Sequence, residues 1–90
     1  MLKTIKDAVE EVTGLQINKN TRQREYVMAR MYYAYFARHY TLRSLTKVGK
    51  EVNRDHATVL HYVKTIKNLI ETDKETRQVV DSINKYLRTI

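Results

Sequence analysis

The feature that most constrains the fold is the stretch 44–70, SLTKVGKEVNRDHATVLHYVKTIKNLI, which has the pattern of two helices joined by a sharp turn. Ser44 is a good N-cap residue, and it predicts a short helix over 45–52. The apolar residues of that helix recur at helical spacing and form one face: Leu45, Val48 and Val52. Gly49 costs about 1 kcal/mol of helix propensity. Its presence therefore predicts that another part of the backbone approaches closely at this point.

The second helix of this stretch is predicted to begin after a turn made by Asn53 and Arg54, with Asp55 as its N-cap. Its core-facing side is predicted to carry Val59, Leu60, Val63, Ile66, Leu69 and Ile70. Its first turn is polar or small instead. A buried helix with a polar first turn is how a helix-turn-helix presents its recognition helix to the DNA major groove.

The segment 54–61, RDHATVLH, resembles the RDHTTVLHA signature of the DNA-binding domain (domain IV) of DnaA, the bacterial replication initiator. Seven of the first eight signature positions match, and Ala57 stands at the family's first threonine. Thr41, Ser44 and Leu45 match the family's LT…SL pattern. The family often has FGGRDH at the turn, whereas this chain has EVNRDH, without glycine. Asn53 can still make the turn, since asparagine tolerates positive φ better than most residues.

The resemblance implies an all-α fold, a small helical bundle of about five helices with a helix-turn-helix over about 44–70, related to the Trp repressor. It implies a single DNA-binding domain over 1–90. It also implies sequence-specific binding of double-stranded DNA at a DnaA-box-like site, in replication initiation or its regulation. The DNA site would be bound by a monomer, and other replication-initiation proteins are possible partners. The chain would be a bacterial or phage-encoded, nucleoid-associated protein of the cytoplasm.

The positive charge is concentrated around this motif. Residues 19–64 hold ten Lys and Arg and three acidic residues, a net charge of +7, and the rest of the chain has seven of each sign. A diffuse excess would only aid solubility, but an excess gathered around one motif favours a polyanionic partner.

The remaining segments predict three more helices and a basic loop. Residues 2–13 have an amphipathic helical pattern that ends at Gly14. The loop 18–24, NKNTRQR, precedes a long helix from about residue 22 to Tyr40. The aromatic cluster 32–36 within that helix is read as bundle core, and the alternative is a base-stacking platform for single-stranded DNA or RNA. Thr72 and Glu75 have the spacing of a capping box, which predicts a last helix to about Arg88.

Several classes of function are excluded. There is no cysteine, and no apolar segment is long enough for a membrane span or a secretory signal. No GxxxxGK[ST] loop is present, so no ATPase activity is expected. His56 and His61 are splayed by about 140° on a helix, and no second carboxylate or nucleophile joins them and Asp55. We therefore expect neither an enzyme, a cofactor nor a metal site.

The candidate contacts to DNA come from four segments. They are the reading helix, which is the predicted helix that begins after Asp55, the short helix 45–52, the basic loop and the long helix. The residues expected to contact bases in the major groove are Asp55, His56, Ala57 and Thr58. By the resemblance, Arg24 matches the family arginine that enters the minor groove, and Arg30 and Arg38 match basic positions on the long helix. The residues expected to contact the DNA backbone are Lys19, Arg22, Arg30, Arg38, Lys47, Lys50, Arg54, His61 and Lys64. For Arg54 an ionic bond to Asp55 is the alternative, and for His61 it is an interior position.

The alternative function is a protein-interaction module that binds or antagonises a replication initiator or its partners. Such a module would expose an apolar patch rather than a basic one.

Overall fold

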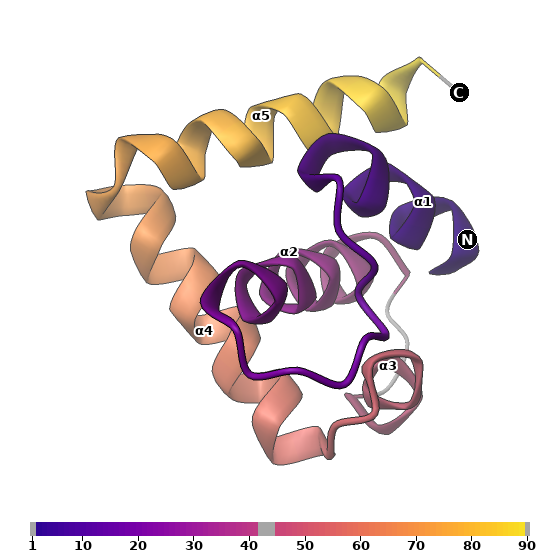
Figure 1. Ribbon diagram of the computed structural model, residues 1–90. Coiled ribbons are helices and arrows are strands. Elements are labelled where there is room, and N and C mark those ends of the chain that lie inside the picture. Colours follow the sequence, from indigo (N-terminus) through magenta and orange to yellow (C-terminus); the bar gives the residue numbers. More distant parts are fainter. Residues whose placement is uncertain (1, 42–44, 90) are drawn as a thin grey trace.

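The computed structural model describes residues 2–41 and 45–89 of the chain. These residues form five α-helices and no strand: α1 (Leu2–Thr13), α2 (Arg24–Thr41), α3 (Leu45–Val52), α4 (His56–Thr72) and α5 (Lys74–Arg88) (Figure 1). The predicted all-α fold with a helix-turn-helix is confirmed, and α3 and α4 are its two helices. None of the helices in the described residues is both long and apolar enough to cross a lipid bilayer.

Helix α2 is the centre of the bundle. It contacts α1, α3 and α4, while α5 crosses over α1 and α4 at the opposite end from α3 (Figure 1). Most of the buried residues of α2 come from the aromatic cluster and its neighbours: Ala29, Tyr32, Tyr33, Ala34, Phe36 and Ala37. Burial also raises the pKa of the Tyr33 hydroxyl above its ordinary value. The rings of Tyr32, Tyr33 and Phe36 are therefore bundle core and are not available as a stacking platform for bases, whereas Tyr35 is half-buried.

The helix boundaries follow the predicted signals with one difference. Gly14 has a φ of +74° after α1, as expected of a residue that ends a helix there. The predicted cap Ser44 lies outside the described residues. The prediction of a capping box at Thr72 was wrong, because Asp73 is the N-cap of α5 and its side chain accepts a hydrogen bond from the backbone N–H of Thr76. A carboxylate at the N-cap position satisfies that N–H and favours the positive end of the helix dipole.

Candidate nucleic-acid interface

The turn between α3 and α4 is built by close contact between two backbone segments. The N–H of Arg54 donates to the carbonyl oxygen of Gly49 over 2.9 Å. A Cβ added to Gly49 would lie only 2.1 Å from the carbonyl oxygen of Arg54, so no larger residue fits without displacing the turn. Asn53 has a φ of 55°, the positive value that it was predicted to adopt in a turn without glycine. The sharp turn therefore exists here without the glycines common in the family.

Arg54 is half-buried and bonds to this turn. Its Nη1 donates to the carbonyl oxygens of Asn53, over 2.8 Å, and Val52, over 3.3 Å. The last carbonyls of a helix have no partner within it, and Arg54 supplies one for the end of α3. The alternative bond from Arg54 to Asp55 is not among the interactions of the described residues. Arg54 thus holds the turn in place, whether or not it also reaches a phosphate.

Asp55 is the N-cap of α4, as predicted. Its Oδ1 accepts a hydrogen bond of 2.8 Å from the backbone N–H of Thr58. Hydrogen bonds from the backbone and side chain of Thr58 lower the pKa of Asp55 below its ordinary value, so the carboxylate is charged at neutral pH. The Asp55 carboxylate is exposed, so it can accept a further hydrogen bond from an external donor.

The two capping carboxylates predict how stability depends on pH. The pKa of Asp55 is lowered, and that of Asp73 is lowered by its hydrogen bonds from Thr76. A lowered pKa in the folded state means that the ionised caps stabilise the fold above the unfolded value of about 3.9. That stability is lost as the pH falls through the folded pKa values. We expect the midpoint temperature of thermal unfolding, followed by circular dichroism, to decrease as the pH is lowered below about 4.

The matched control for this prediction is the double variant D55N/D73N. Asparagine caps a helix well but does not titrate in this range. The double variant should lose part of the acid dependence while it folds at neutral pH. An acid dependence identical to that of the original chain would contradict the assignment of these two caps.

The first turn of α4 presents its polar side chains to solvent. His56 and Ala57 are exposed and Thr58 is half-buried. His61 and Lys64 are also exposed, so the alternative of an interior His61 was wrong. In the described residues no three His, Asp or Glu side chains are grouped so as to hold a metal ion.

Leu60 differs from its prediction. It is 42% exposed instead of core-facing, because α4 turns only Val59, Tyr62, Val63 and Ile66 fully toward the bundle. Leu60 lies one helical turn after His56, and together with Tyr35 and Val63 it lines a hollow of about 200 Å³ whose other residues are Arg38 and Lys67. Leu60, which the sequence pattern had assigned to the core, therefore adjoins the proposed reading face as an exposed apolar side chain.

The basic loop descends from the end of α1 toward the end of the molecule that holds α3 and the start of α4 (Figure 1). Lys19 and Arg22 are exposed on this loop. The ammonium group of Lys19 lies over the ring of Tyr26, 5.0 Å from its centroid. The loop cations and the first turn of α4 thus lie at one end of the bundle, where a single duplex can meet both.

Arg30 is the one predicted contact that the structure contradicts. It was expected to reach a phosphate, but it is only 1% exposed. Its Nη1 donates to the carbonyl oxygen of Lys19 over 3.1 Å and its Nη2 to that of Thr21 over 2.8 Å. The guanidinium therefore points inward at the loop backbone and is not a phosphate contact in this structure.

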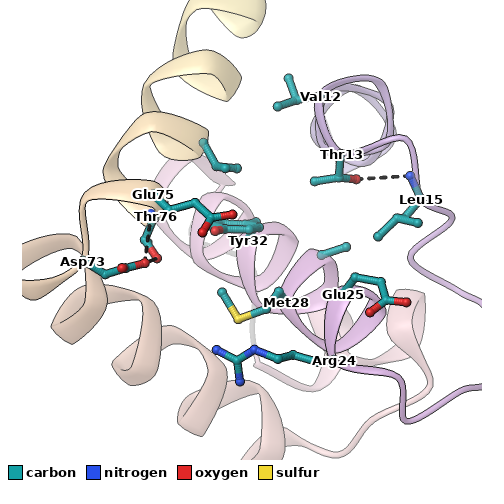
Figure 2. A pocket seen from close by; sticks show the side chains of 12 residues that line it. Val12, Thr13, Leu15, Arg24, Glu25, Met28, Tyr32, Asp73, Glu75 and Thr76 are labelled. Carbon is teal, nitrogen blue, oxygen red and sulfur yellow. Dashed lines mark hydrogen bonds between the residues drawn. The ribbon is translucent and has the colours of Figure 1, made fainter.

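Arg24 begins α2 and is exposed. Figure 2 shows its guanidinium at a hollow of about 450 Å³, which lies between the end of α1, the start of α2 and the start of α5. Asp73, Glu75 and Glu25 also line this hollow, over a floor that includes Met28 and Tyr32. Arg24 contributes to lowering the pKa of Asp73. Its charge thus acts on the α5 terminus in the free protein.

The remaining predicted backbone contacts are spread over two helices. Arg38, Lys47 and Lys50 are all exposed, the first on α2 and the others on α3. Arg38 and Lys47 also have interactions within the protein. These cations extend the positive surface from the reading helix α4 to α2 and α3.

One residue near the loop was missed by the sequence interpretation. The Oε2 of Glu10, on the amphipathic helix α1, accepts a hydrogen bond of 3.0 Å from the backbone N–H of Ile17. The side chain of Ile17 is fully buried. No sequence signal connects an acidic residue on an amphipathic helix with an N–H seven residues later.

Comparison with known proteins gives consistent results. The sequence model of the family described as "Bacterial dnaA protein helix-turn-helix" matches residues 2–66. The chain is 47% identical to the chromosomal replication initiator protein DnaA of Flavobacterium psychrophilum over 72 residues, which are 79% of this chain and 15% of that protein. It is 44% identical to the same-named protein of Bacteroides thetaiotaomicron over 73 residues, 80% of this chain and 16% of that protein. For Streptococcus pyogenes serotype M49 the identity is 40% over 78 residues, 86% of this chain and 17% of that protein. No solved structure matches the chain.

Proposed function

Because the chain belongs to the family of the bacterial DnaA helix-turn-helix, we propose that it binds double-stranded DNA at a DnaA-box-like site and acts in replication initiation or its regulation. The observation that carries this proposal is the start of α4. There an exposed, capped first turn is held by a tight backbone contact to α3. A helix-turn-helix needs this rigid presentation to place side chains against base edges.

The first turn of α4 offers complementary chemistry for bases in the major groove. The exposed carboxylate of Asp55 accepts from a cytosine amino group, and His56 donates or accepts at a base edge. Thr58 offers a hydroxyl and a methyl group, and Ala57 packs against a thymine methyl without the hydroxyl of the family threonine. The site read is therefore DnaA-box-like, with altered preference at the base pair that faces Ala57.

Contacts to the DNA backbone fix the register of α4. In this proposal the exposed cations on the loop and the helices neutralise phosphates: Lys19, Arg22, Arg38, Lys47, Lys50 and Lys64, with His61 as a further donor. Arg54 contributes through its remaining donors. Arg24 enters the minor groove, where a guanidinium suits the focused negative potential of A·T-rich DNA.

The chain spans 15–17% of the length of the three relatives named above. The activities of those whole proteins are therefore not assigned to this domain. We propose that the domain reads DNA as a monomer and without ATP hydrolysis, in the bacterial cytoplasm at the nucleoid.

The test is a fluorescence-anisotropy titration with two duplexes, one with a DnaA box and one scrambled, at low and near-physiological salt. Box-selective binding that survives the higher salt supports the proposal. Equal and salt-labile binding to both duplexes contradicts DnaA-box reading, and selection from random duplexes would then define the site.

A second candidate function rests on Leu60. Its 42% exposure beside the hollow with Tyr35 and Val63 is what a protein-interaction module would present. Failure to bind either duplex would favour this candidate, in which the domain binds a replication-initiation protein instead of DNA.

A further inference from the structure

Arg30 is a buried cation for which the proposed DNA contacts have no use. No carboxylate pairs with it among the described residues, and both terminal nitrogens donate to carbonyl oxygens of the basic loop, nine and eleven residues earlier. Burying a guanidinium is costly unless its donors are satisfied, and the buried Nε of Arg30 has no hydrogen-bond partner among the described residues. The sequence thus keeps an arginine inside the bundle at a position where it holds two points of the loop backbone together.

The two points held by Arg30 bracket the exposed cations of the loop. Lys19 provides one of the carbonyls, and Thr21, which directly precedes Arg22, provides the other. Within the loop, the N–H of Thr21 donates to the carbonyl of Lys19 over 3.0 Å, and the Thr21 Oγ1 accepts from the N–H of Gln23 over 3.2 Å. The backbone around Arg22 is therefore fixed from the bundle side while its side chain stays exposed.

The start of the loop is fixed in a similar way from α1. The side chain of Ile17 is fully buried, and its N–H is bonded to the carboxylate of Glu10. The bonds from Arg30 come from α2. The loop is thus anchored to two different helices, and the Arg30 anchor is the one nearest to the proposed DNA-contacting cations.

We propose that Arg30 is a positioning residue for DNA binding, which holds the loop 19–23 in its DNA-ready shape without touching DNA itself. This inference rests on the proposed function. A loop that is already ordered loses less conformational entropy when it binds. Arg30 therefore increases affinity through Lys19 and Arg22, whose charges meet the phosphates.

The test compares R30M with the matched control R22M, since both variants lose one positive charge. Methionine fills the interior without donors, and apolar replacement of a buried ion is often tolerated. In R30M we expect faster hydrogen exchange at the amides of Thr21 and Gln23, measured by NMR, and binding to the preferred duplex weaker by about tenfold or more. The salt dependence of binding should keep its slope, because the same phosphates are neutralised in the complex.

R22M is expected to change the salt dependence of binding and to leave the hydrogen exchange of the loop unchanged. The loop amides should stay protected, while the slope of log K against log salt falls by about 1, as for one lost phosphate contact. A reduced slope in R30M with a protected loop would overturn the inference, because it would show Arg30 at a phosphate. An R30M variant with unchanged loop protection and unchanged affinity would overturn it as well.

Two further measurements keep the test decisive. If R30M does not fold, R30K takes its place, because an ammonium keeps the charge but lacks the fork that bonds two separate carbonyls. In R30K the loop amides should again exchange faster, and full protection would overturn the inference. If the original chain binds neither duplex, the proposed function fails, while the exchange data still decide whether Arg30 orders the loop.

Discussion

The variant G49A is expected to destabilise the domain by about 3 kcal/mol or more. The new Cβ would lie 2.1 Å from the carbonyl oxygen of Arg54 and 3.3 Å from a methyl carbon of Val59, a fully buried residue. The first contact is with backbone, so no flexible side chain can move away to relieve it. Chemical denaturation followed by circular dichroism measures the change in the free energy of unfolding.

The matched control is G14A, the same substitution at the other glycine. Gly14 has a φ of +74°, and nothing lies within 4 Å of an added Cβ. That variant should therefore lose only the roughly 1–2 kcal/mol of a left-handed residue. Helix propensity alone predicts the opposite for Gly49, namely a gain of about 1 kcal/mol from alanine inside a helix. A G49A domain as stable as the original would show that the turn can open without loss.

The success of the sequence interpretation at α3 and α4 has a local cause. Gly49, Asn53 and Asp55 each act on backbone within a few residues, through missing side-chain volume, positive φ and a cap. Such effects are visible in a short window of sequence. The apolar spacing of α1 and α3 likewise defined bounds that the structure reproduces. The fold class and the frame of the candidate interface could be predicted for these reasons.

The errors arose where a side chain acts over a longer range. Arg30 was assigned to the DNA backbone because it matches a basic position of the family on the long helix. Its burial depends on carbonyls nine and eleven residues away, whose position only the folded loop defines. The hydrogen bond from the N–H of Ile17 to the carboxylate of Glu10 is of the same kind. For Leu60 the pattern predicted the correct helix, but it included Leu60 in the buried face of that helix, where the side chain is exposed instead.

The cap of α5 shows a third source of error. Thr72 and Asp73 are adjacent, and both are good N-cap residues. The capping-box spacing of Thr72 and Glu75 favoured the first, but α4 extends to Thr72. Asp73 is left to serve as the C-cap of α4 and the N-cap of α5 at once. A pattern read for one helix could not include where the preceding helix stops.

The variant H56A is expected to weaken binding to the preferred duplex by about 1–3 kcal/mol and to reduce discrimination between sequences. His56 is the first residue of α4, exposed, and next to the charged cap Asp55. Base contacts stabilise only the complex with the correct sequence, so their loss lowers affinity for that sequence and leaves non-specific binding nearly unchanged. Anisotropy titrations with the preferred and a scrambled duplex measure both affinities.

H61A is the matched control, because it removes the same side chain from an exposed position further along the same helix. A phosphate contact carries no sequence information, so H61A should weaken binding to both duplexes by a similar factor. The ratio of the two affinities separates these roles even where the losses on the preferred duplex are alike. An equal loss on both duplexes after H56A would remove His56 from the base-reading residues and leave Asp55 and Thr58 as the remaining polar readers of the first turn. Since the Oδ1 of Asp55 already accepts from the N–H of Thr58, discrimination would then depend on the remaining acceptor capacity of the Asp55 carboxylate and on the Thr58 side chain.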